Sequence, residues 1–254
     1  MGVITYNGVA SSTYNIIVSK QPNYEFPEKD VEVIHVPGRN GDLVFDKGIY
    51  NNVKRTYSIW AGPEAGDFKT LASKISKWLH SSKGYAVLED TYEPDYYRMA
   101  YYKDENNIEN MLNEAGTIDA TFICKPQRFY KSGNSFITVP NNGKSFENPT
   151  VYTAQPVIKV SPKDDYPIGT FTWNGRLIRV HFGIGQTQNP IYIDATTMDC
   201  YSIISGSYAN KNQNVVFVDG YKFPMLESGI TSVQYSDPRA TTCVVEVKPN
   251  WYTI

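Results

Sequence analysis

The stretch Phe68–Leu79, which reads FKTLASKISKWL, decides how this chain folds. Its apolar residues recur every three or four positions, so they share one stripe along a helix of 3.6 residues per turn. This stripe consists of Phe68, Leu71, Ala72, Ile75, Trp78 and Leu79. Lysine, serine and threonine fill the opposite face, as is typical of a helix that covers a core. We therefore predict a helix over about residues 67–80 whose apolar stripe is buried.

Both ends of this helix carry typical signals. Asp67 is placed to accept hydrogen bonds from the free amide groups of the first turn. Gly84 follows Lys83 just beyond the last apolar residue and provides a stop signal. No other stretch has a comparable helical period. A single amphipathic helix in a β-rich chain usually covers one face of a sheet, and we expect that arrangement here.

The segments around the helix read as strands. Each is an apolar alternation or a short apolar run bounded by turn residues, such as the hairpin signal Asn7-Gly8. The predicted strands are 3–9, 14–19, 31–36, 43–45, 55–60, 85–88, 96–102 and 117–124. The polar segment 46–54 is interpreted as a connection, and 103–117 as a second, long connection.

The second half of the chain reads as a separate β domain. Between residues 131 and 149 the composition shifts to Ser, Gly, Asn and Pro, which predicts a domain boundary. The strands predicted beyond it are 156–160, 169–173, 177–182, 191–194, 215–218, 232–235 and 242–247. Their spacing is typical of a β-sandwich. We predict a first domain 1–135, a linker 136–148 and a second domain 149–254, whose last strand could pack back on the first domain.

The composition of the 254 residues limits the class of protein. Aromatic residues make up 14% of the chain, including 20 Tyr, which favours β structure. The formal net charge is −2 and no run of Lys and Arg exceeds two, so we expect no sequence-specific binding of nucleic acid. The three Cys are widely spaced, which suits folding in a reducing cytoplasm. We expect no signal peptide and no membrane span.

Residues that could carry catalysis or bind a metal are scattered. The histidines, none of which has another ligand at metal-binding spacing, are His35, His80 and His181. Four acidic residues cluster around one turn, namely Glu89, Asp90, Glu93 and Asp95. They could suggest a hydrolytic carboxylate pair. Because nothing nearby offers a nucleophile or a concave apolar wall, we interpret them as a solvated acidic loop. We predict no catalytic, cofactor or metal site and no enzyme activity.

The aromatic residues of the second domain raise the alternative of a carbohydrate-binding module, because sugars stack on exposed aromatic faces. They are Trp173, Tyr192, Tyr201, Tyr208 and Tyr221. All of them fall within predicted strands or beside hairpin turns. We therefore favour roles in the sandwich core and in the hairpins, and we expect no lectin activity.

Several features of the chain, taken in order, resemble one family. The first half has a Pro-Gly-Arg-Asn-Gly loop after a strand, then a strand that ends at Trp60, then the helix. The loop contributes Pro37, Gly38, Arg39 and Gly41. The matching positions of the second half are Asn148, Pro149, Asp194, Phe223, Pro224, Leu226 and Gly229. The ordered combination covers nearly the whole chain, and it resembles the distal tail proteins (Dit) of long-tailed bacteriophages that infect Gram-positive hosts.

This resemblance implies a fold and a function. The expected fold is mainly β, with a first domain of split-barrel-like sheets that carries one belt helix and a second domain that is a galectin-like β-sandwich. The expected function is structural: a homo-oligomeric ring, most simply a hexamer, in the virion tail tip. The implied partners are the tail tube protein, the tail hub or tail-associated protein, and receptor-binding or baseplate proteins. The genome would pass through the ring, and assembly would take place in the host cytoplasm.

Overall fold

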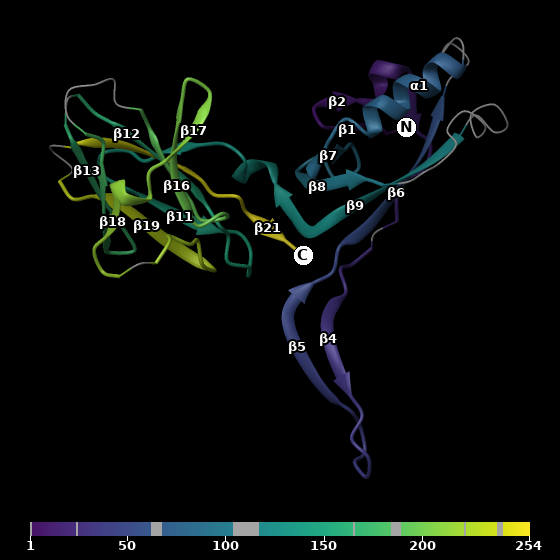
Figure 1. Ribbon diagram of the computed structural model, residues 1–254, viewed down its shortest axis with the longest axis horizontal. Helices are drawn as coiled ribbons and strands as arrows, with labels where there is room; N and C mark the ends of the chain where they lie inside the picture. Colours follow the sequence, from purple (N-terminus) through teal and green to yellow (C-terminus); the bar gives the residue numbers. More distant parts are fainter. Residues whose placement is uncertain are drawn as a thin grey trace. The chain divides into compact units, whose positions relative to one another are not determined.

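The structure is a computed structural model that describes residues 2–23, 25–61, 68–103, 117–164, 166–183, 189–220, 222–237 and 241–254 (Figure 1). In these ranges the chain is mainly β, and α1 (Phe68–Leu79) is the only α-helix. The chain divides into two compact units, one formed by Met1–Arg128 with Ile254 and the other by Phe129–Thr253. The prediction of a mainly β chain with two domains and one helix is confirmed.

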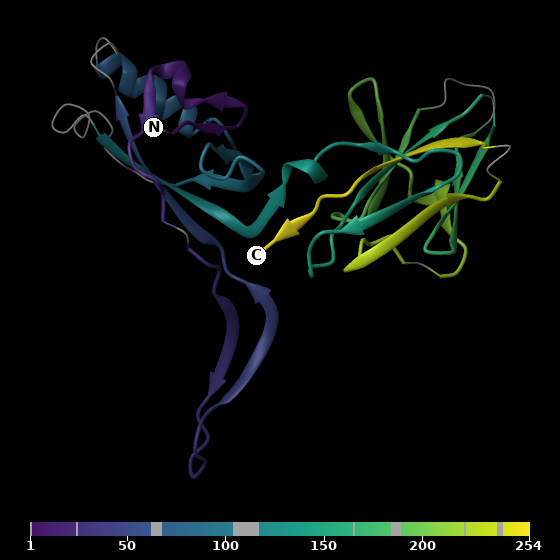
Figure 2. The ribbon, with the colours of Figure 1, turned by 180° about the vertical axis from the view of Figure 1, so that it is seen from behind.

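The first unit contains a sheet and a separate two-stranded ribbon (Figures 1 and 2). The strand order of the sheet is β2-β1-β7-β8-β9-β6-β3. Its strands are β1 (Ile4–Tyr6), β2 (Val9–Ala10), β3 (Ile16–Val18), β6 (Val53–Ala61), β7 (Ala86–Asp90), β8 (Tyr96–Tyr102) and β9 (Thr117–Tyr130). The short 3-10 helix η1 (Ser11–Tyr14) precedes β3. The ribbon consists of β4 (Lys29–Ile34) and β5 (Leu43–Tyr50), which pair with each other.

Helix α1 covers one face of this sheet. It contributes five buried side chains to the core of the unit, namely Leu71, Ala72, Ile75, Trp78 and Leu79. The same core contains buried side chains from β1, β3, β6, β7, β8 and β9. The indole of Trp78 makes two contacts in this core. Its Nε1 donates to Tyr6 O at 3.1 Å, and its ring lies 5.5 Å from the ring of Tyr14. No helix in the described ranges is long and apolar enough to cross a membrane.

Some predictions fall on residues that the structure does not describe. They are the cap residue Asp67, the side chain of Phe68, most of the connection 103–117, and Tyr221.

The interpretation of residues 46–54 as a connection was wrong. Strand β5 continues to Tyr50, and β6 begins at Val53, so the turn between them is short. Polar residues are accommodated in this part of β5 because charges on β4 neutralise them. Lys29 Nζ lies 3.0 Å from Asp46 Oδ2, and Lys47 Nζ lies 3.0 Å from Asp30 Oδ1. Cross-strand pairs of opposite charge stabilise a strand that has little apolar surface.

The second unit is a β-sandwich of two antiparallel sheets. The first sheet has the order β10-β20-β12-β15-β16-β17 and the second β11-β19-β13-β14-β18. The strands of the first sheet are β10 (Ile137–Thr138), β20 (Cys243–Lys248), β12 (Val157–Pro162), β15 (Ile191–Asp194), β16 (Asp199–Ile204) and β17 (Ser207–Asn210). Those of the second are β11 (Lys144–Asn148), β19 (Gly229–Tyr235), β13 (Ile168–Trp173), β14 (Arg176–His181) and β18 (Val215–Phe217). Buried side chains from both sheets form one core.

Three shorter elements complete this unit. The 3-10 helices are η3 (Lys131–Gly133) and η4 (Asn212–Asn214). Strand β21 (Tyr252–Thr253) pairs with the end of β9, where the N–H of Tyr130 donates to Trp251 O at 2.9 Å.

The segment 136–148, predicted as a linker, contributes strands β10 and β11 to the sandwich. Pro140, Asn141, Asn142 and Gly143 form the tight turn between these strands, where Gly143 N donates to Pro140 O at 2.8 Å. Gly143 has a φ of +83°, and a Cβ there would lie 2.9 Å from Val233 O. The composition therefore marked a turn within the sandwich.

The three cysteines should be unreactive in the folded chain. Cys124, Cys200 and Cys243 are all buried and free. Burial raises the pKa of the Cys124 and Cys200 thiols to about 12 and that of Cys243 to about 11, so very little reactive thiolate forms. We expect a thiol-specific chromogenic reagent at mildly alkaline pH to label none of them until urea unfolds the chain. Rapid labelling of any cysteine in the native protein would contradict this packing.

Candidate assembly surface

The β4–β5 ribbon carries apolar side chains on both of its faces. Its register places Val33 opposite Val44 and Ile34 opposite Leu43. Because side chains alternate between the two faces along each strand, this register sorts the apolar residues into two groups. One face carries Val31, Val33 and Val44, and the other carries Ile34, Leu43 and Phe45.

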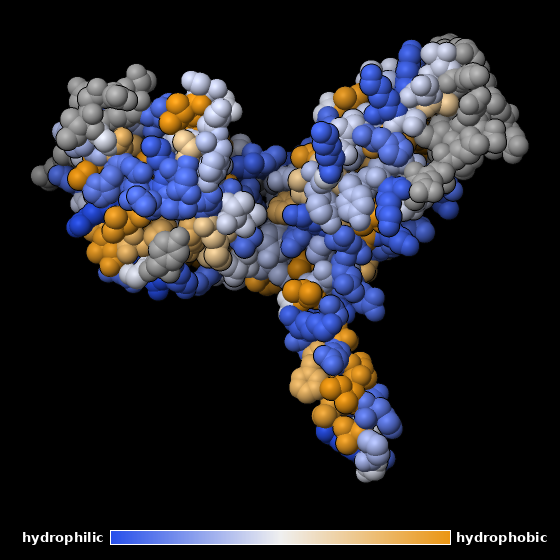
Figure 3. Space-filling view, viewed as in Figure 1, coloured by the Kyte–Doolittle hydropathy of each residue, from blue (hydrophilic) through white to orange (hydrophobic). Residues whose placement is uncertain are grey.

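Both faces are open to solvent. Val33 is 55% exposed and Val44 62% exposed on the first face, and Phe45 is 54% exposed on the second. Figure 3 shows hydrophobic residues along the side of the ribbon that faces the viewer. A two-stranded ribbon alone is only marginally stable in water. Contiguous exposed apolar side chains usually mark a surface that another protein covers.

The root of the ribbon carries charged side chains that pair across its two strands. The two cross-strand ion pairs described above lie near this end, and Asn51 N donates to Glu28 O at 2.8 Å. The N–H of Gly48 donates to Asp46 Oδ1 at 2.8 Å, and this bond, followed by the charge of Lys29, lowers the pKa of Asp46. The ion pairs therefore gather where the ribbon leaves the unit, and the apolar groups of the two faces lie beyond them, apart from Ile49, which is 56% exposed near the root.

The tip of the ribbon contains the Pro-Gly-Arg-Asn-Gly loop. Gly38 and Gly41 have φ values of +83° and +81°, a backbone conformation that favours glycine, so the loop depends on both. Arg39 N donates to Val36 O at 3.2 Å. Pro37 and Arg39 are exposed, and Arg39 presents a cation at the end of the apolar ribbon.

The four acidic residues around the turn between β7 and β8 were predicted to form a solvated loop, and for two of them this was wrong. Asp95 is exposed and Glu89 is half-buried. Asp90 and Glu93 are buried, because three arginines surround them. Arg55 Nη2 lies 3.3 Å from Asp90 Oδ2 and 3.0 Å from Glu93 Oε2. Glu93 also receives Arg98 Nη2 at 3.3 Å and Arg128 Nη1 at 2.5 Å. Sequence reasoning missed this cluster because its arginines come from β6, β8 and β9.

This buried cluster also positions the root of the ribbon. Arg55 lies on β6 shortly after the turn from β5, and its Nη1 donates to Asn23 O at 3.4 Å on the segment that leads into β4. Tyr57 OH donates to Asp90 Oδ2 at 2.7 Å. Burial, and then the charge of Asp90, raise the pKa of Tyr57 well above its usual value, so the phenol keeps its proton and remains a donor. The ribbon is thus anchored in a fixed polar core.

Three motif positions of the second unit, Asn148, Leu226 and Gly229, meet at one loop. Asn148 Nδ2 donates to Leu226 O at 3.0 Å and to Tyr152 O at 2.8 Å, and Asn148 Oδ1 accepts from Thr150 N at 2.9 Å. Gly229 is paired with Asn148 at the start of β19 and has a φ of +96°. These contacts hold the turn after β11 against Leu226 and Gly229. The role of Asn148 and Gly229 is therefore structural.

The remaining motif positions lie apart from this loop. Trp60 is half-buried on β6, and Pro149 is exposed in the turn after β11. Asp194 ends β15, where its Oδ1 accepts from Thr196 N at 2.8 Å. Phe223 and Pro224 line a pocket that is described below.

The described residues contain no group of His, Cys, Asp and Glu that could hold a metal ion. The histidines lie in separate surroundings. His35 Nδ1 lies 3.0 Å from Asp42 Oδ1 at the ribbon tip, and His80 Nδ1 lies 2.9 Å from Ser76 O at the end of α1.

The aromatic residues named from the sequence fall into two places. Tyr192, Tyr201 and Tyr208 stack in a row across β15, β16 and β17, with successive ring centroids 5.3 Å apart. Trp173 lies in the other sheet, where its Nε1 donates to Met225 O at 3.0 Å.

Comparison with known proteins gives a fold. No protein-family model matches the sequence, and no curated protein matches it significantly. The structure is similar to the crystal structure of the SPP1 Dit protein, described as a paradigm of the hub adsorption apparatus in phages that infect Gram-positive bacteria. The TM-score is 0.68 at 9% sequence identity, and all of both chains is covered.

Two further similar chains come from the baseplate of phage p2 in its activated conformation. The chain from the structure with Sr gives a TM-score of 0.52 at 11% identity, and the chain from the structure with Ca gives 0.50 at 10%. Both alignments cover 98% of each chain. The chain therefore has the two-domain β fold found in phage hub and baseplate proteins.

Proposed function

We propose that this chain is a structural subunit of a bacteriophage tail tip, where copies close into a ring through the β4–β5 ribbon. The observation that carries the proposal is the ribbon itself, which is apolar and exposed on both faces. The shared fold with SPP1 Dit and with a chain of the p2 baseplate supports the same role. The protein acts by assembly, and no catalytic step belongs to this proposal.

A ring explains why both faces of the ribbon are apolar. A ribbon inserted between neighbouring subunits is covered on each side, which removes the apolar surface from water. A contact of this kind is heterologous, and it closes without free ends when the rotation between subunits completes a circle. It also protects the outer edges of β4 and β5, which in the described chain have no further strand beside them. We propose a hexamer.

The other partners follow from a place in the tail tip. The ring would contact the tail tube protein on one side and the tail hub and receptor-binding or baseplate proteins on the other. Its lumen would let the genome pass without reading its sequence, which agrees with a net charge of −2 and the lack of a basic field. The second unit would project outward. Subunits would assemble in the host cytoplasm and remain in the virion.

The ribbon can be tested by a paired substitution that keeps its own strands together. Val33 and Val44 lie opposite each other. Val33→Lys combined with Val44→Glu would replace an apolar pair by a cross-strand ion pair, so the ribbon should still form while its first face becomes polar. In native mass spectrometry and sedimentation velocity, we expect the parent chain to give a closed oligomer and this variant to give monomers.

A matched control makes the same chemical changes elsewhere. Val151 and Ile230 are strongly exposed in the second unit and lie outside the ribbon. Val151→Lys combined with Ile230→Glu should leave the oligomer unchanged. If the parent chain forms rings only during tail assembly, ring density at the tail tip of the particle replaces the solution measurement. Monomers in solution together with no ring density at the tip would sink the proposal.

A further inference from the structure

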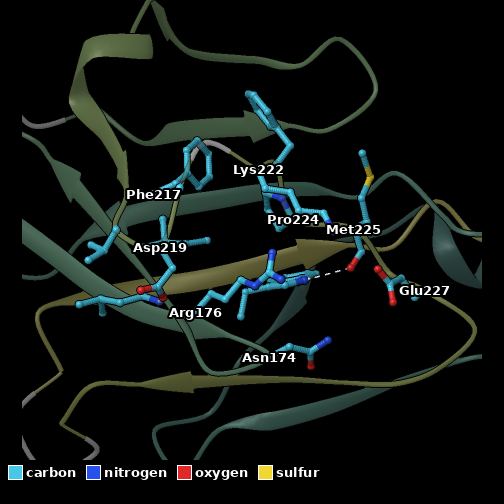
Figure 4. A pocket seen from close by; sticks show the side chains of 14 residues that line it. Asn174, Arg176, Phe217, Asp219, Lys222, Pro224, Met225 and Glu227 are labelled. Carbon is cyan, nitrogen blue, oxygen red and sulfur yellow. Dashed lines mark hydrogen bonds between the residues drawn. The ribbon is translucent and has the colours of Figure 1, made fainter.

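The second unit contains a pocket of about 180 Å³ at one end of the five-stranded sheet (Figure 4). Three segments form it: the turn between β13 and β14, the chain just after β18, and residues 222–227. These segments are far apart in the sequence, and the sheet order β19-β13-β14-β18 brings them together. No part of the proposed ring assembly uses this pocket.

The floor and walls of the pocket are apolar and aromatic. Trp173, Ile178 and Phe223 are buried side chains of the sandwich core that reach its inner surface, and Phe217 and Met225 form its walls. The indole of Trp173 cannot rotate freely, because its Nε1 donates to Met225 O at 3.0 Å. The floor is therefore a fixed surface suited to an apolar ring face.

The rim of the pocket is charged and balanced. It carries two cations and two carboxylates, which are Arg176, Lys222, Asp219 and Glu227. Figure 4 shows Arg176 and Asp219 along one side and Lys222 along the other. Within the described ranges, no hydrogen bond or ion pair joins the side chain of Arg176, Lys222 or Glu227 to another residue; Arg176 pairs with Trp173 through the strands of the hairpin. The guanidinium group of Arg176 and the carboxylate of Glu227 thus line the same small space without a hydrogen bond to another described side chain.

Two polar groups of the rim are held in place before any ligand arrives. Asn174 Oδ1 accepts from Ser232 N at 2.7 Å and Asn174 N donates to Ser232 O at 2.8 Å, which leaves the Nδ2 protons as free donors. Asp219 Oδ2 accepts from Leu177 N at 3.4 Å, which leaves Oδ1 as a free acceptor. Groups fixed in this way lose little conformational entropy on binding.

Contrary to the expectation from the sequence that the second domain has no lectin activity, we infer that this pocket binds one neutral hexopyranose ring. The ring has an apolar C–H face that would lie on the aromatic floor, and hydroxyl groups around its edge. Those hydroxyls would accept from Arg176 and Asn174 and donate to Asp219. A neutral ligand is favoured because the two carboxylates offset the two cations. The volume suits one sugar ring, and a few placed polar groups around an apolar floor are typical of ligand sites.

The test is saturation-transfer NMR and calorimetry on the full chain with methyl glycosides of glucose, galactose, mannose and N-acetylglucosamine. A single small ring gives few contacts, so we expect a dissociation constant on the order of 1 mM for the best of them. Arg176→Ala should weaken that binding at least about tenfold, and Asp219→Asn should weaken it in the same direction.

The matched control is Arg179→Ala, because Arg179 is also exposed on β14 but does not line the pocket. This variant should bind as the parent does. The inference is overturned if no glycoside binds at tens of millimolar, or if Arg176→Ala binds as well as Arg179→Ala. It is also overturned if a hexose phosphate or an acetylated phenylalanine amide binds more tightly than the neutral sugars. These readouts are independent of ring formation.

Discussion

An Arg55→Ala variant should lose about 3–5 kcal/mol of the free energy of unfolding. Arg55 is almost fully buried and is the only arginine in the cluster that contacts both Asp90 and Glu93 among the described residues. Its removal would leave Asp90 with Tyr57 OH and backbone N–H donors but with no cation beside it. A buried charge without a counter-charge is costly, so the loss should approach that of a large core truncation. Urea unfolding followed by circular dichroism measures it.

Arg128→Ala is the graded control for this experiment. The side chain of Arg128 is partly exposed, and Glu93 keeps Arg55 and Arg98 when Arg128 is removed. Its loss should therefore cost clearly less than that of Arg55. Equal or reversed effects would show that Arg55 does not balance the buried carboxylates. The Arg55 variant should also loosen the root of the ribbon, which faster hydrogen exchange at the amide of Asn51 would reveal.

Trp78→Ala is expected to destabilise the first unit by about 3–5 kcal/mol. The indole is 2% exposed, packs against Tyr14, and hydrogen-bonds to Tyr6 O. Truncation would open a cavity under α1 and leave a buried carbonyl without its donor. The same urea titration should show an earlier transition for the first unit, while the second unit, which has its own core, unfolds as before.

Two further variants separate packing from propensity in the helix. Ser73 lies on the exposed face of α1, so Ser73→Ala should change stability by no more than about 0.5 kcal/mol. Trp78→Phe fills most of the space but cannot donate to Tyr6 O. The free energy of unfolding that it loses should be more than for Ser73→Ala and less than for Trp78→Ala. If Trp78→Ala melted with the parent chain, the apolar face of α1 would not be part of a packed core.

The parts of the fold that the sequence predicted well are those set by local periodicity. Helix α1 follows from its 3.6-residue repeat, and the turn between β1 and β2 from Asn7-Gly8, where both residues have positive φ. Errors arose where distant charges decide the structure. Asp90 and Glu93 read as solvated because Arg55, which buries them, lies 35 and 38 residues away. Strand β5 was cut short for the same reason, since its polar residues are neutralised from β4.

The candidate surfaces show a similar limit. The sequence predicted that β4 and part of β5 are strands, but an apolar alternation does not reveal whether a third layer covers them. The exposure of the apolar side chains of the ribbon became evident only from the structure. The sequence did not predict the pocket either. Trp173, Asn174 and Arg176 are adjacent in the sequence, whereas Asp219 and Glu227 join them only through the strand order of the sheet.

The position of β20 has a consequence for how the chain is made. This strand lies between β10 and β12, which do not pair with each other, so the six-stranded sheet has a gap until β20 is inserted. During translation, that sheet cannot be completed until residue 248 has left the ribosome. Pairing at such sequence separation is intrinsically slow. Every strand that the structure describes in the first unit ends by residue 130, so this unit can fold before the second unit is complete.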